Sequence, residues 1–446
     1  MTTTPEAYVH LSADKKTLTF YYGTLRAERD GTTWGIEDKK AYYNSFIPTW
    51  AGDSNSPNTT ILTAVFDASF CDFRPTTTTR WFQYFKSLKS IEGLEHLNTS
   101  QVTEMIRMFE GCSSLTSLDL SNFDTSKVTY MYEIFSGCES LTALDLSNFD
   151  TSNVTSMSSM FSHCQSLTAL DLSNFNTSKV TDISGMFSGC ESLTSLDLSS
   201  FDTSKVTSMG ERLGGMWEGM FSGCKSLTTL DLSSFNTSKV TNMWGMFSHC
   251  SSLTSLDLSH FDTSKVTYME SMFHDCKSLT TLDLSNFNTS EVTSMFRMFE
   301  GCRSLTSLDL SNFDTSQVTN MRDMFHYCWS LTSLDLSNFD TSKVTDMKEM
   351  FGNCQSLTAL DLSCFDTSKV KDMSGMFSHC SSLTTLDLSS FDTSEVIDMG
   401  EIFSDCSSLT SLNLSQPLPL RHFAGGGDER DVLWLLLFDF SRPLQL

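Results

Sequence analysis

A repeat of 26 residues dominates the chain and limits what it can fold into. The tripeptide Leu-Asp-Leu, replaced by Leu-Asn-Leu in its last copy, recurs every 26 residues, with a single step of 34 residues. The eight surplus residues lie within Gly210–Gly219. The tripeptides begin at Leu118, Leu144, Leu170, Leu196, Leu230, Leu256, Leu282, Leu308, Leu334, Leu360, Leu386 and Leu412. A fixed period of this size predicts a solenoid, in which each coil buries its apolar face only against its neighbours.

Each unit combines two apolar patterns. Leu118–Leu120 alternates two leucines with an aspartate, which is the period of a strand with one buried face. Met131–Cys138 places its apolar residues at i, i+3, i+4 and i+7, the period of a short helix. The residue before the cysteine, such as Gly137 or His163, is of a type that tolerates the left-handed conformation that ends a helix. We therefore predict an α/β solenoid, a right-handed stack of short parallel strands with short return helices.

The unit also resembles the repeats of a known family. Leu115–Leu120 matches the L-x-x-L-x-L signature of leucine-rich repeats, with Phe123 where a typical unit has Asn or Cys. The longer pattern F-D-T-S-x-V-T-x-M-x-x-M-F-x-x-C is similar to the 26-residue repeat of BspA-like leucine-rich-repeat bacterial surface proteins. Three earlier segments are similar to the N-terminal region of that family: Thr17–Tyr22, Val65–Phe70 and Arg74–Phe82.

The resemblance covers roughly residues 15–415 and carries several implications. It implies a leucine-rich-repeat-like fold and an adhesin that holds host extracellular matrix proteins or other cells. We find no signal-peptide pattern at the start of the sequence and no apolar run of the length that spans a bilayer. A cell-surface or extracellular localisation is therefore implied by the resemblance alone.

The chain divides into three predicted parts. Residues 1–80 lack the period, contain β-branched and aromatic segments between turn residues, and are predicted to form a β-rich cap on the first coil. A separate ligand-binding role for this segment is the alternative. Residues 81–415 form the array, which begins with a degenerate coil. Residues 416–446 depart from the repeat.

This last segment is predicted to be a frameshifted C-terminus. Codons compatible with residues 420–446 can be read one base later as one further repeat unit. Residues that were not selected to fold with the array are expected to be poorly ordered, and an uncapped last coil would favour end-to-end self-association. The alternative is a genuine hydrophobic anchor, although Val432–Phe440 is too short to span a bilayer.

Composition and motifs argue against several classes of function. The formal net charge of −25 and the pI near 4.6 disfavour binding to nucleic acid or to anionic membranes. The nine histidines are scattered, and the sequence contains no G-x-S-x-G, phosphate-binding loop or H-E-x-x-H motif. We expect the protein not to be an enzyme and to use no cofactor.

The cysteines follow the repeat. Twelve of the 14 occupy one position of the unit, and Cys71 and Cys364 lie outside it. The twelve are Cys112, Cys138, Cys164, Cys190, Cys224, Cys250, Cys276, Cys302, Cys328, Cys354, Cys380 and Cys406. We predict a ladder of buried free thiols, because the side chains should point inward together rather than at one another. Disulfides between adjacent coils and a metal ladder are the alternatives; without C-x-x-C pairs we expect no metal.

The aspartates of the tripeptides form an acidic ladder. They are Asp119, Asp145, Asp171, Asp197, Asp231, Asp257, Asp283, Asp309, Asp335, Asp361 and Asp387. Each lies between two inward leucines and is predicted to point outward, so that like charges stand in line. A solvated face that keeps the array soluble is one interpretation. Weak multivalent Ca²⁺ binding, or a basic partner, is the other.

Residues that differ between coils are the candidates for ligand binding. The inserted segment contributes Arg212, Met216 and Trp217, and the coils contribute Trp244, Tyr268, Phe296, Arg297, Tyr327 and Trp329. Tyr130, Tyr132 and His326 vary in the same way. Exposed aromatic residues and arginine dominate binding hot spots, whereas neutral variation on an exposed edge is the alternative. We therefore expect a non-enzymatic protein-binding module, with a structural spacer or a cation-dependent self-assembly module as alternatives.

Overall fold

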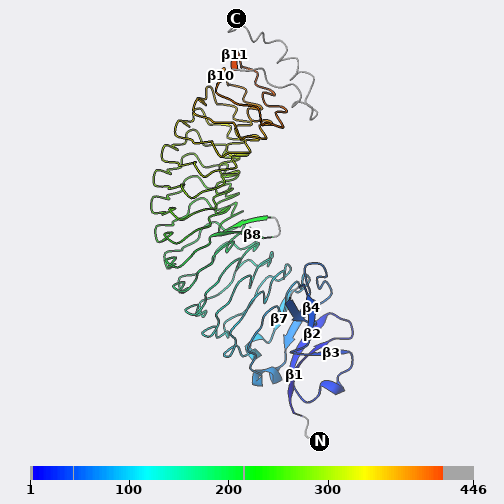
Figure 1. The fold of residues 1–446 in the computed structure, drawn as a ribbon. Coiled ribbons are helices and arrows are strands. Elements are labelled where there is room, and N and C mark those ends of the chain that lie inside the picture. The colour runs from blue at the N-terminus through cyan, green and yellow to red at the C-terminus, as the bar shows by residue number, and fades with distance from the viewer. Residues whose placement is uncertain (1–3, 44, 214–215, 415–446) are drawn as a thin grey trace. The chain divides into compact units, whose positions relative to one another are not determined.

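The protein is represented by a computed structural model that describes residues 4–43, 45–213 and 216–414. The chain forms two compact units. Unit 1 comprises Met1–Val206 with Gly223–Ser226, and unit 2 comprises Thr207–Ser222 with Leu227–Leu446. Both units are built from coils of the repeat (Figure 1).

Unit 1 begins with a mixed five-stranded sheet in the order β3-β1-β2-β6-β7. Its strands are β1 (Glu6–Leu11), β2 (Thr17–Gly23), β3 (Thr32–Gly35), β6 (Thr63–Phe66) and β7 (Ser90–Glu92). β1 pairs antiparallel with β2 and β3, whereas β2, β6 and β7 are mutually parallel. A separate hairpin joins β4 (Lys39–Tyr42) to β5 (Ser45–Pro48), and the 3-10 helices are η1 (Arg26–Glu28), η2 (Ala68–Asp72) and η3 (Leu94–His96).

An aromatic cluster links this sheet to the first coils. The ring of Phe20 on β2 lies 4.5 Å from Phe66, 5.6 Å from Trp81 and 5.6 Å from Phe82, centroid to centroid. Trp50 donates its indole N–H to the carbonyl of Trp81 at 2.9 Å. The N-terminal segment therefore shares one hydrophobic core with the coils that follow it.

Bonding of the coil type begins inside residues 1–80. Thr77 forms an isolated parallel bridge with Glu104, and the amide of Arg80 donates to the carbonyl of Ile106 at 2.9 Å. The first coil is thus built partly from the segment assigned to the cap.

The turn segment of each coil, for example Met157–Cys164, divides its hydrogen bonds between its own turns and the next coil. The amide of Met160 donates to the carbonyl of Met157 at 3.2 Å. The amides of Phe161 and His163 donate to carbonyls of the next coil, at 2.9 and 2.6 Å. Along the segment, amides that close a turn therefore alternate with amides that bond the next coil.

The predicted return helices are wrong. No α-helix is present among the coil residues that the structure describes. In a helix the amides beyond the first turn would bond carbonyls of their own segment four residues earlier, whereas here alternate amides along the whole segment bond the neighbouring coil. The i, i+3, i+4, i+7 spacing fits this arrangement as well as a helix, because the overlapping turns place Met157, Met160, Phe161 and Cys164 in the core. The coils form a repeat fold of extended and turn segments rather than an α/β fold.

Two residues of each uninterrupted turn segment have a left-handed backbone. In the same example φ is 52° at Ser159 and 57° at His163, each the third residue of a four-residue turn. The left-handed residue before the cysteine was predicted and is confirmed, also at Gly137 and Tyr327. The first left-handed position was not predicted, because it holds many residue types.

A buried threonine ladder joins coils in both units. Thr289 donates its hydroxyl to the carbonyl of Asp314 at 2.8 Å and accepts the amide of the same residue at 2.8 Å. Thr151 bonds Asn176 in the same two ways in unit 1. The hydroxyl replaces a backbone partner at a point where the coils make no direct backbone bond, and Thr151 and Thr289 are both fully buried.

An asparagine near the leucine signature also joins coils. Asn148 donates its side-chain amide to the carbonyls of Leu120 and Phe123, at 3.0 and 2.8 Å. A typical leucine-rich repeat has an asparagine at the position of Phe123. Here the asparagine stands one residue earlier in the unit, and Phe123 is buried at the usual asparagine position.

Regular pairing of the tripeptide segments occurs where β10 (Thr385–Leu388) meets β11 (Ser411–Leu414), in the predicted parallel register. Asp387 lies opposite Asn413, which donates to its Oδ2 at 3.1 Å. The other Leu-Asp-Leu segments of the described coils form no regular strand, although single bonds such as Thr280 N to Thr254 O at 3.4 Å link them. Like charges directly opposite destabilise a sheet, so we infer that facing carboxylates limit pairing at those steps.

The core consists of columns of like residues. Phenylalanine rings stack at 5.6 to 5.9 Å between centroids, from Phe82 to Phe187 in unit 1 and from Phe221 to Phe403 in unit 2. All twelve cysteines of the ladder are buried and free. Each thiol contacts a phenylalanine carbonyl of the preceding coil, as in Cys302 Sγ to Phe273 O at 3.2 Å.

The inserted segment is a hairpin of β8 (Gly210–Leu213) and β9 (Met216–Gly219). It replaces the two residues between the methionines of a turn segment, and Met220 N still donates to Met209 O at 2.8 Å. A Cβ at Gly210 would lie 2.0 Å from the carbonyl oxygen of Trp244, so this base position admits only glycine. The core of the coil is therefore unchanged by the insertion.

Replacing Thr289 with valine should test the threonine ladder. T289V keeps the shape but leaves the amide and carbonyl of Asp314 without their partner, and we expect a loss of about 1–3 kcal/mol in the free energy of unfolding. Urea denaturation measures the loss. The exposed Thr306 provides the matched control, and an equal loss for T306V would contradict the role of the ladder.

Thiol accessibility should separate the two classes of cysteine. N-ethylmaleimide is expected to modify two thiols of the native chain, Cys71 and Cys364, which are exposed, and all 14 after denaturation. Intact-mass spectrometry counts the adducts. Burial raises the pKa of Cys190 to about 12, which further suppresses its reaction. More than two adducts under native conditions would show that the ladder is open to solvent.

Candidate functional site

The side chains above the turn segments differ strongly between coils. We define the turn face as the surface formed by the turn segments and the residues that flank them. Three positions of each segment are compared first, the two left-handed residues and the residue before the second, as in Ser159, Ser162 and His163. Five successive coils of unit 2 hold Gly245, Ser248 and His249; Ser271, His274 and Asp275; Arg297, Glu300 and Gly301; Asp323, His326 and Tyr327; and Glu349, Gly352 and Asn353. Their proximity arises from the stacking of coils.

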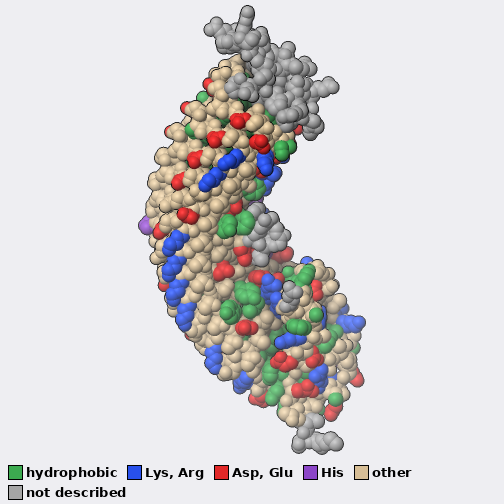
Figure 2. Space-filling model, viewed as in Figure 1, with side chains coloured by type: hydrophobic (Ala, Val, Ile, Leu, Met, Phe, Trp, Pro, Cys, Tyr) green, Lys and Arg blue, Asp and Glu red, His purple; other side chains and the backbone are tan. Residues whose placement is uncertain are grey.

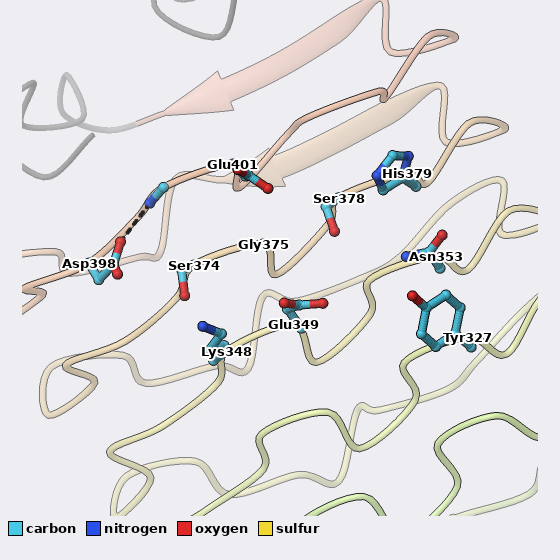
Figure 3. Close-up of a pocket in the computed structure, with 11 residues that line it drawn as sticks. Tyr327, Lys348, Glu349, Asn353, Ser374, Gly375, Ser378, His379, Asp398 and Glu401 are labelled. Carbon is cyan, nitrogen blue, oxygen red and sulfur yellow. Dashed lines mark hydrogen bonds between the residues drawn. The ribbon is translucent and has the colours of Figure 1, made fainter. Parts of the chain in front are cut away.

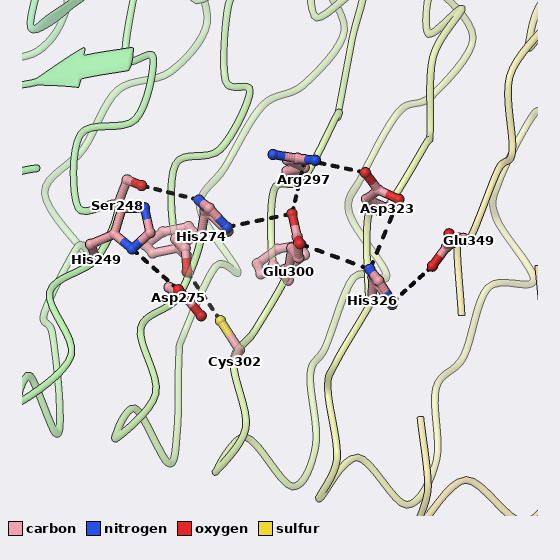
Figure 4. Close-up of polar contacts among 12 residues, drawn as sticks. Ser248, His249, His274, Asp275, Arg297, Glu300, Cys302, Asp323, His326 and Glu349 are labelled. Carbon is pink, nitrogen blue, oxygen red and sulfur yellow. Dashed lines mark hydrogen bonds and ion pairs between the residues drawn. The ribbon is translucent and has the colours of Figure 1, made fainter. Parts of the chain in front are cut away.

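Arg297 and His326 organise a chain of ionic contacts on this face (Figure 4). Arg297 Nε lies 3.0 Å from Glu300 Oε2 and 3.2 Å from Asp323 Oδ2. His326 Nε2 lies 2.9 Å from Glu349 Oε2, and its Nδ1 lies 3.8 Å from Glu300 Oε1. Burial raises the pKa of Glu300 to about 7, against the opposing effect of Arg297. Arg297, a predicted ligand-binding residue, is therefore already paired with two carboxylates of the protein.

The same chain continues to a pair of histidines. His249 Nδ1 lies 3.2 Å from Asp275 Oδ2, and His274 Nε2 lies 3.5 Å from Glu300 Oε2. Burial and the nearby His249 together lower the pKa of His274 to about 4, so that His274 is neutral at pH 7. Burial acts to raise the pKa of Asp275, but the hydrogen bond with His249 and the nearby positive groups lower it to about 2.

Two groups on the turn face have the donor types of a metal site. Within the described residues, His249, His274 and Asp275 bring three potential ligand atoms within 4.8 Å of one another. Asp323, His326 and Glu349 do the same. Both groups were missed from the sequence, because their members lie in different coils and no local motif joins them. The shared position in the 26-residue period is the signal by which they could have been found.

A polar hollow of about 290 Å³ follows the second group (Figure 3). It is lined by the small residues Ser374, Gly375 and Ser378 and by the larger Tyr327 and Glu349. A Cβ at Gly375 would lie 2.8 Å from Glu349 Cγ, so the absence of a side chain keeps the hollow open. Its hydroxyl, amide and carboxylate lining suits a small polar group.

Unit 1 has its own cluster on the turn face. Arg107 Nη2 lies 2.6 Å from Glu133 Oε1, and Arg107 Nε lies 3.6 Å from Glu110 Oε2. Gln83 donates its amide to Glu110 Oε2 at 2.6 Å. Burial raises the pKa of Glu110. The charges of Arg107 and Glu133 are therefore paired within the protein, whereas Arg107 Nε and Gln83 Oε1 are buried without a hydrogen-bond partner among the described residues.

The predicted aromatic residues form two groups in unit 2. Trp244 stacks on Tyr268 at 6.2 Å between ring centroids, and Tyr268 is 47% exposed. The guanidinium of Arg297 lies 4.8 Å from the ring centroid of Phe296. The space-filling view shows coils covered mostly by polar side chains and backbone, with hydrophobic side chains gathered in a few places (Figure 2).

The second aromatic group surrounds Trp329. Its ring lies 6.3 Å from that of Tyr327, and the guanidinium of Arg303 lies 4.2 Å from its centroid. Tyr327 is 37% exposed and borders the polar hollow. The sequence placed Tyr327 and Trp329 at variable positions, and the stack brings them together.

The hairpin residues Arg212, Met216 and Trp217 have a defined backbone register, with Arg212 opposite Trp217. Their side chains lie outside the described part of the chain. Because the hairpin replaces turn residues, its base lies on the turn face, where Gly210 abuts the backbone of Trp244. The inserted segment and the first aromatic group are therefore neighbours.

The acidic ladder is exposed along both units. Each carboxylate accepts the amide of the serine two residues later; for Asp309 and Ser311 the distance is 2.9 Å. This bond and the serine hydroxyl lower the pKa of Asp309, against the repulsion of Asp283 and Asp335. One oxygen of each carboxylate thus already accepts a hydrogen bond from the backbone of the same chain.

Stacked coils with a leucine signature, a buried thiol column and a variable polar face define a leucine-rich-type repeat protein. The chain belongs to the family described as "Mycoplasma protein of unknown function, DUF285", which matches residues 76–170, 141–216, 215–333 and 321–416. The predicted resemblance of the repeat unit to BspA-like leucine-rich-repeat surface proteins is confirmed over the matched residues. No curated protein matches the chain.

Several solved structures are similar to this chain. A leucine-rich repeat protein from Bacteroides ovatus is 16% identical, with 95% of this chain and 97% of that chain covered and a TM-score of 0.42. A leucine rich cell surface protein from Faecalibacterium prausnitzii is 18% identical, with 92% and 93% covered and a TM-score of 0.33. A leucine-rich repeat protein from Eubacterium ventriosum is 15% identical, with 94% and 97% covered and a TM-score of 0.35.

The described residues include no helix with the length and apolar character needed to cross a membrane.

Neutralising one rung of the acidic ladder should cost less stability than neutralising an aspartate outside it. D309N keeps an acceptor for Ser311 and removes the repulsion from Asp283 and Asp335, but it also removes the negative charge that strengthens the hydrogen bonds to Ser311. Because the pKa of Asp309 is lowered, those bonds outweigh the repulsion, and we expect D309N to lower the melting temperature, but by less than D262N does in low salt. The difference should shrink in about 1 M NaCl, where the Debye length is about 3 Å.

The matched control is D262N. Asp262 also accepts the amide of a following serine, Ser264, but the same position holds Asn236 and Asn288 in the neighbouring coils. Differential scanning calorimetry at both salt concentrations compares the variants. An equal, salt-independent effect of D309N and D262N would rule out repulsion along the ladder.

Proposed function

We propose that the protein is a non-enzymatic, adhesin-type module that binds host extracellular matrix proteins or other cells through the turn face of unit 2. The observation that carries the proposal is the placement of the β8–β9 hairpin. It emerges from the turn face without altering the coil core, and its base abuts the backbone beside Trp244. The hairpin thereby adds a surface that the other coils lack, while the core of the coil stays the same as in those coils.

The aromatic residues near this hairpin have the chemistry of a protein-binding surface. Tyr268 is 47% exposed and stacks on Trp244, and the Phe296–Arg297 pair adds an aromatic ring beside a cation. Tyrosine, tryptophan and arginine are the residue types that most often dominate binding energy. The polar coils around them supply a soluble frame.

Two further statements belong to the same proposal. We propose a cell-surface location, which rests on the resemblance of the repeat unit and which surface biotinylation of intact cells tests. We also propose that the coils wind in the right-handed sense as a solenoid, because a crossover between parallel neighbours such as β10 and β11 is right-handed in nearly all proteins.

A hairpin deletion should remove binding without unfolding the protein. Replacing Gly210–Gly219 by Ser-Ser copies the uninterrupted turn Met157-Ser158-Ser159-Met160 of unit 1. We expect at least a tenfold loss of solid-phase binding to immobilised matrix proteins, about 1.4 kcal/mol or more, with the melting temperature retained.

Tyr268 and Tyr130 provide a matched pair of variants. Both occupy the same position of the repeat and are similarly exposed, at 47% and 43%. Y268S should weaken binding, whereas Y130S should not. Unchanged binding in both the deletion and Y268S would exclude this surface. A parent protein that binds no matrix protein or cell would favour the spacer, and calcium-dependent sedimentation would favour the self-assembly module.

A further inference from the structure

Two histidines and an aspartate on the turn face of unit 2 form a group of potential metal ligands. His249 Nδ1 lies 3.2 Å from Asp275 Oδ2, and the rings of His249 and His274 are 4.6 Å apart. Together the three residues bring one ligand atom each within 4.8 Å of the others. In a tetrahedral site with bonds of about 2.0–2.1 Å, ligand atoms are about 3.3 Å apart, so small side-chain movements suffice.

The backbone fixes the relative positions of the three residues. The amide of His249 donates to the carbonyl of His274 in the next coil at 2.6 Å. His249 and Asp275 occupy equivalent left-handed positions, both with φ of 58°, where other coils have glycine, such as Gly301. The stack therefore holds two imidazoles and a carboxylate on adjacent coils without any local sequence motif.

We propose that His249, His274 and Asp275 bind one divalent first-row metal ion such as Zn²⁺. Two imidazoles and one carboxylate are a ligand set used for such ions, and the set leaves at least one coordination position for water or for a side chain of a partner. The side chains of His249 and Asp275 are 46% and 22% exposed, so an ion can enter from solvent. This site departs from the expectation of a chain without metal.

Neighbouring groups shape the site. Ser248 Oγ lies 3.3 Å from His274 Nδ1, and Glu300 Oε2 lies 3.5 Å from Nε2. One of these contacts must be given up when a ring nitrogen of His274 binds the ion, and the other then orients the ring. Lys277 Nζ lies 3.5 Å from Asp275 Oδ2. Its ammonium must move aside when a metal ion binds, and its side chain is 41% exposed and can do so.

The second group, Asp323, His326 and Glu349, is less suited to a metal ion. It offers one imidazole, and its Asp323 is already shared by Arg297 and Arg322, at 3.2 and 3.4 Å. Two guanidinium groups at one carboxylate oppose a further cation. We therefore expect one bound metal ion for each chain.

The experiment uses the full-length chain with C71S and C364S, since the exposed thiols of these residues would otherwise compete for metal. After chelator treatment, calorimetric titration with Zn²⁺ should give one equivalent, and Co²⁺ should show the absorption bands of a nitrogen- and oxygen-ligated site. H274S should weaken binding by more than about 100-fold, because it removes one ligand. Retained melting temperature shows that the variant is folded.

The chain offers a matched site for a gain of binding. His379 Nδ1 lies 3.1 Å from Asp405 Oδ2 at the equivalent positions of two later coils, but Ser404 stands where the first site has His274. S404H should therefore add a second equivalent of Zn²⁺. A variant S404A is the control and should leave one equivalent.

Several outcomes would overturn the proposal. One is that the parent chain takes up no Zn²⁺ or Co²⁺. Another is that the H274S variant still binds one full equivalent of Zn²⁺. Loss of binding in H326S with retention in H274S would move the ion to the other group and also overturn it. No second equivalent in S404H would show that these three positions do not suffice. None of these results depends on whether the protein binds matrix proteins.

Discussion

The structure depends on the hydrogen bonds that pass from each coil to the next. In a turn segment such as Met157–Cys164, alternate amides close turns and the others bond the neighbouring coil. The buried hydroxyls of the threonine ladder, as at Thr289, bridge points where backbone groups do not meet directly. Because buried polar groups must be paired, no coil can satisfy its backbone alone, and the apolar columns of phenylalanine, methionine and cysteine add burial to this requirement.

A constant frame of this kind separates stability from recognition. The columns and ladders use the same residues in each coil, whereas the turn face tolerates Gly, Ser, His, Asp, Arg or Glu at equivalent positions. The β8–β9 hairpin is the largest such variation, and the turn bond between Met209 and Met220 is retained beneath it. Ionisable residues on this face are placed in line by stacking, so Arg297, Glu300 and His326 form a network from two coils. The same stacking carries the acidic ladder, whose repulsion is relieved where Asn413 follows Asp387.

Much of this could be predicted from the sequence. The 26-residue step required stacked coils, the inward columns followed from the apolar positions, and the left-handed residue before each cysteine followed from its residue types. The return helices were wrong because the i, i+3, i+4, i+7 spacing fits a run of turns equally well, and only the coil-to-coil bonds distinguish the two. The first left-handed position gave no signal, since it holds residues as different as Ser159 and Arg297.

The sequence by itself determined the period, the buried columns and the exposed acidic row, because each depends on a residue pattern within one unit. Only the tertiary structure decided which residues of different coils meet. His249 and Asp275 are 26 residues apart and carry no motif, yet their side chains lie 3.2 Å apart, and Trp244 stacks on Tyr268. The physical reason is that the register between coils is set by backbone and threonine hydrogen bonds, and side chains on the turn face are brought together as a consequence.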